Sequence, residues 1–121
     1  MAVLTAAEIR DLLDAVVVVG QDKMDMQVEE ACGADLMSDV LAFIKEKAIL
    51  LTGLVSPHVI RTAEMLDIAM VVFVRGKVPP QEVCKLAEER DMVIMSTKNT
   101  MFESCGILYE NGLKGGCAID A

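Results

Sequence analysis

The second half of the chain contains three short, continuous runs of apolar residues, at 48–51, 70–74 and 92–95. The runs begin 22 residues apart, and each is followed by a turn and then by apolar positions at helical spacing. Continuous apolar strands that alternate with helices are typical of a parallel sheet covered on both faces. The pattern predicts consecutive strand–helix units in a three-layer α/β/α fold with a mainly parallel sheet.

Start signals support the predicted helices of this half. Ser56-Pro57 combines a typical N-cap residue with proline at the first helical position, and Pro79-Pro80 repeats the signal. Thr100 and Glu103 have the spacing of a capping box. We therefore expect a helix after each of the three apolar strands.

The first half begins with a capping box at Thr5 and Glu8, which predicts a helix. The run 15–20 is rich in valine and ends at glycine, and it predicts a buried strand. Residues 21–34 are polar and acidic, and alternation at Met24, Met26 and Val28 indicates one more short strand.

The stretch from 36 to 46 predicts a further helix in the first half. Asp35 precedes it as a candidate N-cap residue, and Val40, Leu41 and Ile44 are expected to face inward.

Length and composition indicate one domain. The chain has 121 residues, of which 54% are hydrophobic, and only three Phe and one Tyr are aromatic. We expect a single domain over residues 1–113 and a flexible tail over 114–121. A monomer of a chain with so many apolar and so few aromatic residues is expected to expose apolar surface, and a homodimer would cover that surface.

Charge excludes several classes of partner. The formal net charge is −8, and the eleven Lys and Arg residues form no cluster, which argues against nucleic acid and against anionic membranes. No apolar stretch approaches the roughly 18 residues of a membrane span, and the N-terminus lacks the pattern of a signal peptide. A cytoplasmic location is expected.

The four cysteines do not predict a metal site. Cys32, Cys84, Cys105 and Cys117 contain no CxxC pair, and the chain has one histidine, so no metal or other cofactor is expected. Reduced thiols are predicted, with Cys84 and Cys105 in the core. Cys117 lies in the glycine-containing tail and is the candidate redox-sensitive residue.

The turns that follow the three strands should meet at one edge of the sheet, where open α/β sheets bind ligands. Hydroxyls, glycines, basic side chains and helix N-termini converge there, which suits a small anion. The candidate ligand-binding residues are Gly53, Ser56, His58, Arg75, Gly76, Thr97 and Thr100. The alternative is that these residues only cap helices and form turns.

No catalytic residue is predicted. The chain lacks a P-loop, a GxGxxG motif and a GxSxG motif, and nothing in the sequence supplies an orienting partner for His58.

Four stretches in order resemble the DRTGG-domain family, over about residues 3–113. They are 33–40, 48–53, 70–76 with Pro79-Pro80, and 95–103. The resemblance implies a fold similar to the N-terminal, non-catalytic domain of the kinase/phosphorylase that acts on the histidine-containing phosphocarrier protein. The Asp-Arg-Thr-Gly-Gly signature itself is absent, and Gly53-Leu54-Val55 stands where related members have Gly-Asp-Arg.

The resemblance implies a non-catalytic regulatory or assembly domain, and the strand-end edge adds a possible anionic ligand. Because stand-alone members are often encoded near iron-only hydrogenase genes, an accessory or redox-responsive protein partner of such a system is the alternative. A small kinase-like protein is a second alternative, which the missing P-loop disfavours.

Overall fold

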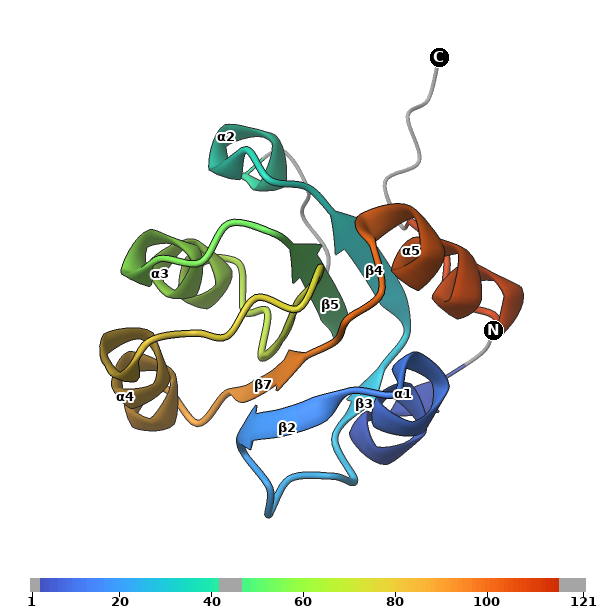
Figure 1. Cartoon of the computed structure of the whole chain (residues 1–121), viewed down its shortest axis with the longest axis horizontal. Helices are drawn as coiled ribbons and strands as arrows, with labels where there is room; N and C mark the ends of the chain where they lie inside the picture. Colours follow the sequence, from blue (N-terminus) through green and yellow to red (C-terminus); the bar gives the residue numbers. More distant parts are fainter. Residues whose placement is uncertain (1–2, 42–46, 116–121) are drawn as a thin grey trace.

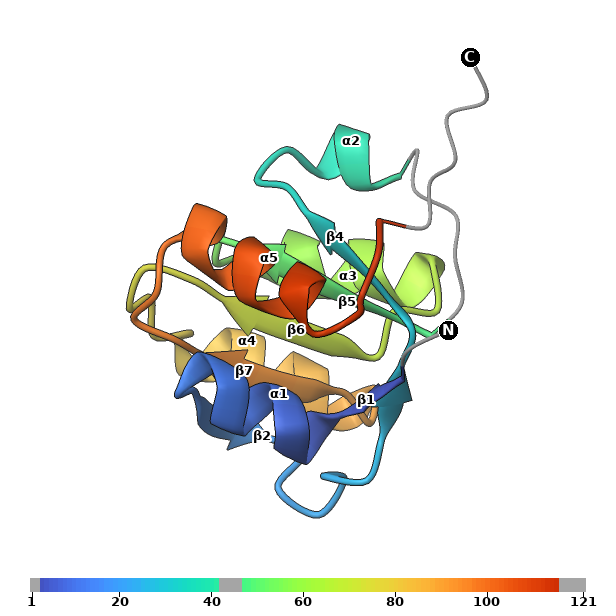
Figure 2. The ribbon, with the colours of Figure 1, turned by 90° about the vertical axis from the view of Figure 1, so that its right-hand side faces the viewer.

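The computed structural model describes residues 3–41 and 47–115. It has three layers, with α3 (Pro57–Met65) and α4 (Gln81–Glu89) on one face of a central sheet and α1 (Ala6–Leu13) and α5 (Met101–Glu110) on the other (Figures 1 and 2). The strands of this sheet are β2 (Val16–Val19), β4 (Glu30–Gly33), β5 (Ala48–Thr52), β6 (Met70–Phe73) and β7 (Val93–Ser96). The expected α/β/α architecture is confirmed.

The order of strands in the sheet is β2-β7-β6-β5-β4. The four strands from β4 to β7 are parallel, while β2 pairs antiparallel with β7 and places Val16 opposite Ser96. Two short strands, β1 (Leu4–Thr5) and β3 (Gln27–Val28), form a separate antiparallel pair. The amino end of β2 therefore lies at the same sheet edge as the carboxyl ends of β4, β5, β6 and β7.

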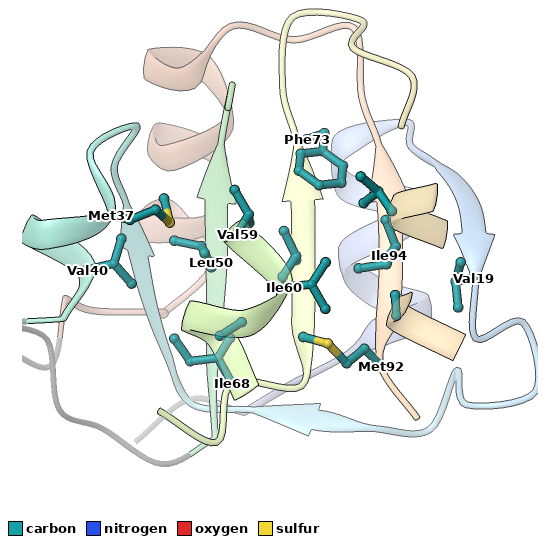
Figure 3. Close-up of a cluster of buried hydrophobic side chains, with 14 of the residues drawn as sticks. Val19, Met37, Val40, Leu50, Val59, Ile60, Ile68, Phe73, Met92 and Ile94 are labelled. Carbon is teal, nitrogen blue, oxygen red and sulfur yellow. The ribbon is translucent and has the colours of Figure 1, made fainter. Parts of the chain in front are cut away.

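The parallel strands are buried on both faces, because alternate side chains enter two different cores. Leu50, Phe73 and Ile94 point to the core under α3 and α4, which Figure 3 shows. Ile49 and Met95, on the same strands, pack on the opposite face under α1 and α5. This double burial explains why the strands read as unbroken apolar runs.

Most of the expected helix starts are observed. Thr5 and Glu8 form the capping box of α1, and the Thr100 hydroxyl accepts a hydrogen bond from the Glu103 backbone N–H at the start of α5. Ser56 occupies the N-cap position of α3, but its side chain makes no capping hydrogen bond. In α4 the N-cap residue is Pro80.

Three strands of the first half differ from the expectations. The sequence pattern did not predict β4, because Glu30–Gly33 has only two apolar side chains and lies in an acidic segment. The valine run does form β2, but as an edge strand that pairs on one side only, so Val16 is 68% exposed. The short strand expected near Met24 and Val28 is β3, which covers only Gln27 and Val28.

For the helix expected over 36–46, the predicted N-cap residue and the predicted burial of Leu41 were wrong. The described helix, α2, covers Met37–Val40, and its N-cap residue is Leu36, without a side-chain cap. Val40 is buried as expected, but Leu41 is 42% exposed. Ile44 lies outside the described residues.

Candidate functional site

The edge formed by the carboxyl ends of β4 to β7 holds most of the expected site residues. On its β4–β5 side, one carboxylate joins two strand ends. The Asp35 carboxylate accepts a hydrogen bond from the Gly53 backbone N–H at 2.6 Å and another from the Thr52 hydroxyl at 3.3 Å. Asp35 was expected to cap α2, but it instead ties the segment after β4 to the end of β5.

Arg75 lies directly against Gly53. A Cβ atom on Gly53 would stand 2.5 Å from Nη2 of Arg75, so only glycine leaves room for the guanidinium in this position. Gly53 does not have a positive φ, so the turn itself does not demand glycine. Gly53 follows β5 and Arg75 follows the neighbouring strand β6, so the Arg75 side chain reaches across to Gly53 and occupies the space that a side chain at position 53 would need.

The turn after β6 has an uncommon backbone conformation. Arg75 has φ of +63° and is followed by Gly76 with φ of +70°. A long side chain rarely adopts a left-handed conformation, and such residues are over-represented at functional sites. Arg75 is exposed at the sheet edge formed by the carboxyl ends of the parallel strands.

The backbone N–H groups of this edge are mostly engaged within the protein. The N–H of Arg75 donates to the Asn99 carbonyl and that of Gly76 to the Thr97 carbonyl, both at 2.8 Å. The Gly53 N–H donates to Asp35. The backbone N–H groups of Gly53, Arg75 and Gly76 are therefore already used within the protein.

Thr97 has an internal role that the sequence did not predict. It is 2% exposed, and its hydroxyl donates to the Leu13 carbonyl at 2.7 Å. The Asn99 side-chain amide donates to the same carbonyl at 3.1 Å. Both contacts fasten the turn after β7 to the C-terminal end of α1, so the Thr97 hydroxyl is occupied by this bond.

A cavity with a volume of about 390 Å³ opens on the β7–β2 side of the same edge. Such a volume lies in the lower part of the range typical of small-molecule sites. Its wall combines apolar, polar and charged groups. The lining residues are Asp14, Val16, Val18, Gly76, Val78, Ser96, Thr97 and Lys98.

Three cations stand on the two turns beside this cavity: Arg75, Lys77 and Lys98. All are exposed, and within residues 3–41 and 47–115 none of them forms an ion pair. The ion pairs that the described chain does contain involve Arg10, Lys23 and Arg90. In a chain with a net charge of −8, this edge therefore carries three cations that form no ion pair within the described residues, together with the Asp14 carboxylate in the cavity wall.

The remaining expected site residues are more scattered. Ser56 and His58 lie at the start of α3, where His58 is exposed, and Thr100 lies at the start of α5. Of the seven candidates, Gly53 and Arg75 meet on one side of the edge, while Gly76 and Thr97 line the cavity on the other.

Two of the thiols, Cys84 and Cys105, have a raised pKa. Cys84 and Cys105 were expected in the core but are only partly buried. Burial raises the pKa of the Cys105 thiol, and burial together with the Glu88 carboxylate raises the pKa of the Cys84 thiol. Cys117, the expected redox-sensitive residue, lies outside the described residues. Among residues 3–41 and 47–115, no group of three potential metal ligands comes together.

Several residues of the edge escaped the sequence reading. Asp14, Val16 and Val18 reach the cavity because β2 pairs antiparallel with β7, and nothing in their own pattern indicates this pairing. Lys98 was expected at this edge, in the turn after the strand at 92–95, but it was not among the candidate ligand-binding residues. Asp35 follows a strand that was missed, which is why its clamp on Gly53 was not predicted.

No helix in the described parts of the chain is long and apolar enough to cross a membrane. Comparison with curated proteins found no match. Among solved structures, the chain is similar to the crystal structure of the CBS and DRTGG domains of the regulatory region of Clostridium perfringens pyrophosphatase, complexed with its activator diadenosine tetraphosphate. The TM-score is 0.70 at 17% identity, and the alignment covers 87% of this chain but only 46% of the other. The model of the DRTGG domain matches residues 8–110, and the chain therefore belongs to the DRTGG domain family.

Proposed function

We propose that this chain is a non-catalytic regulatory module that binds a small anionic ligand at the carboxyl edge of its sheet. The observation that carries the proposal is the cavity of about 390 Å³ at this edge, with Lys98 in its wall. Lys77 and Arg75 stand on the neighbouring turn without ion-pair partners in the described chain. Cations without an ion-pair partner are available to an anion, and hydrogen bonds between charged groups are stronger than those between neutral groups.

The related solved structure supports a regulatory role. It belongs to the regulatory region of a pyrophosphatase, and it was solved with a polyphosphate-containing activator. This chain corresponds to about half of that structure, so the comparison supports a regulatory class of function and leaves the ligand to be found by experiment.

The chemistry of the edge favours binding over turnover. A general base needs a partner that orients it and a substrate proton within reach. His58 is exposed, and within the described chain it has no hydrogen-bond or ion-pair partner. Asp35 is already engaged by the Gly53 N–H and the Thr52 hydroxyl. This arrangement is consistent with a module that binds a ligand without transforming it.

The test is a thermal-shift screen of phosphate- and carboxylate-bearing compounds, with inorganic phosphate and pyrophosphate included, followed by calorimetric titration. Lys98→Gln should weaken binding about ten-fold, because one charge-assisted contact is worth roughly 1.5–3 kcal/mol. Arg75→Gln tests whether the anion extends towards Gly53. Lys85→Gln on α4, an exposed lysine away from this edge, is the matched control.

Two outcomes would contradict the proposal. The first is the absence of any anion that binds, and the second is binding that Lys98→Gln and Lys85→Gln weaken equally, because general loss of positive charge would then explain it.

A second function, docking onto a protein partner or onto a second copy of the chain, has its own supporting observation. Three exposed apolar side chains stand at the same edge of the sheet. Leu36 follows β4, Leu54 follows β5, and Phe102 is in the first turn of α5. Phe102 is 83% exposed. Exposed apolar side chains that gather on one side of a molecule are typical of interaction surfaces.

A further inference from the structure

We infer that the cavity beside β2 binds a free α-amino acid with an aliphatic side chain, such as leucine. This inference rests on the proposed anion-binding function, with the α-carboxylate of the ligand as the anion, and it names the class of ligand. Three features of the cavity point to this class: two opposite charges that lie side by side, an apolar wall next to them, and hydrogen bonds that hold this wall.

Asp14 and Lys98 stand on neighbouring antiparallel segments. The Leu13 carbonyl, one residue before Asp14, accepts hydrogen bonds from the two side chains that flank Lys98 in the sequence, at 2.7 and 3.1 Å. Beyond Asp14, Val16 pairs antiparallel with Ser96. Asp14 and Lys98 lie between these two points of attachment, and both line the cavity. The cavity wall therefore presents a carboxylate and an ammonium group side by side.

Neither of these charges is used within the described chain. Both side chains are exposed, and within residues 3–41 and 47–115 neither forms an ion pair or a side-chain hydrogen bond, with each other or with a third group. A doubly charged phosphate bound to Lys98 would stand beside the Asp14 carboxylate, a like charge that repels it.

A zwitterion avoids this repulsion. Its carboxylate can accept hydrogen bonds from the Lys98 ammonium group, while its own ammonium group donates to the Asp14 carboxylate. In an α-amino acid both charged groups are attached to the same carbon atom, so their spacing suits two neighbouring side chains. The paired charges of the wall thus favour an α-amino acid over a simple anion.

The apolar part of the wall selects the side chain of the ligand. It consists of Val16 and Val18 on β2 and Val78 on the turn before α4. Val16 is 68% exposed and Val78 is 77% exposed, so both have apolar surface that a ligand can cover. An aliphatic side chain placed against them would remove apolar surface of both partners from water, which is favourable. Glycine would leave these valines exposed to solvent.

Hydrogen bonds hold this wall in place. The Ser96 hydroxyl donates to the Lys77 carbonyl at 2.6 Å, and the Gly76 N–H donates to the Thr97 carbonyl at 2.8 Å. The turn that leads to Val78 is therefore attached to the end of β7, the same strand with which β2 pairs. A wall that is already held costs less free energy to order when a ligand binds.

The experiment titrates the full-length protein with four compounds by calorimetry. Leucine has all three groups, 4-methylpentanoate lacks the ammonium group, 3-methylbutylamine lacks the carboxylate, and glycine lacks the aliphatic side chain. Leucine should bind at least about ten-fold more tightly than each of the others, because each of them loses one contact worth about that factor.

Two variants test the assignment of the wall. Asp14→Asn keeps a residue that tolerates the left-handed backbone at this position, and it should weaken leucine about ten-fold without weakening 4-methylpentanoate. Val78→Ser changes an exposed side chain, so the fold should be kept, and it should weaken leucine but not glycine. Asp39→Asn, at an exposed position on α2, is the control and should change none of these affinities.

The outcomes separate this inference from the proposed function. Equal binding of leucine and 4-methylpentanoate, both weakened by Lys98→Gln, would overturn the amino-acid assignment and leave the anion site intact. Binding of another anion but not of leucine would have the same meaning. Leucine binding that Asp14→Asn and Asp39→Asn leave equally strong would also overturn the assignment. Failure of leucine and of every carboxylate and phosphate compound would overturn the proposed function itself.

Discussion

Removing the Asp35 carboxylate should destabilise the fold, although the residue is exposed. Asp35 accepts the Gly53 N–H at 2.6 Å, and Gly53 is buried, so Asp35→Ala would leave a buried donor without its partner. An unsatisfied buried donor costs about 1–3 kcal/mol. The Thr52 hydroxyl loses an acceptor too, but it still accepts the Leu54 N–H at 3.1 Å. We expect a loss of about 2 kcal/mol in the free energy of unfolding.

Urea denaturation followed by circular dichroism measures this loss, and a decrease of about 8 °C in Tm should accompany it for a chain of this size. Asp35→Asn keeps a neutral acceptor in nearly the same place and should cost about half as much. Asp39→Ala, an exposed carboxylate on α2 without a hydrogen bond in the described chain, should change stability by less than about 0.5 kcal/mol. If Asp35→Ala and Asp39→Ala unfold at the same urea concentration, the clamp does not stabilise the fold.

Three further predictions concern other parts of the molecule. Gly20→Ala should lower the free energy of unfolding by at least about 2 kcal/mol more than Gly76→Ala, as measured by urea denaturation. Both glycines have a positive φ, but only at Gly20 would the new Cβ meet backbone, 2.9 Å from the Met92 carbonyl oxygen. Equal losses in the two variants would refute this steric explanation. Iodoacetamide at pH 8 should alkylate Cys84 and Cys105 more slowly in the folded than in the urea-unfolded protein, because their raised pKa keeps the folded-state thiols protonated. The difference between the two alkylation rates should shrink as the pH rises above about 9. Equal rates at pH 8 would contradict a raised pKa of these thiols. Light scattering at micromolar concentration should give about twice the chain mass of 13.1 kDa, and a monomer throughout that range would exclude self-association there.

The parallel part of the fold could be predicted because its signals are local. The runs that became β5, β6 and β7 are apolar on both faces, and capping residues such as Thr100 mark where helices begin. Right-handed connections between parallel strands then place the turns after them at one edge. Gly53, Arg75, Gly76 and Thr97 were assigned to that edge by topology alone, and they do lie there.

The parts that could not be predicted depend on pairing between distant segments. β4 has little apolar character of its own and exists as a strand because it pairs with β5 along the register from Glu30 to Gly33. The antiparallel pairing of β2 with β7 likewise has no local signature, and it brings Val16 and Asp14 to the cavity. The roles of side chains at the edge were missed for the same reason, since the partner of Thr97 is the Leu13 carbonyl, 84 residues away.

The placement of the cavity and of the exposed apolar side chains on one edge has a thermodynamic consequence. Leu36, Leu54 and Phe102 lie towards β4 and β5, whereas Lys98 and Val16 line the cavity towards β2. A partner that covers the apolar side would contact the turn of Arg75, whose guanidinium rests on Gly53, and the same turn continues through Gly76 into the cavity wall. If a ligand in the cavity changes the affinity for that partner by some factor, the partner must change the affinity for the ligand by the same factor. The turn of Arg75 and Gly76 belongs to both surfaces, so it is the element through which binding in the cavity and binding on the apolar side would be coupled.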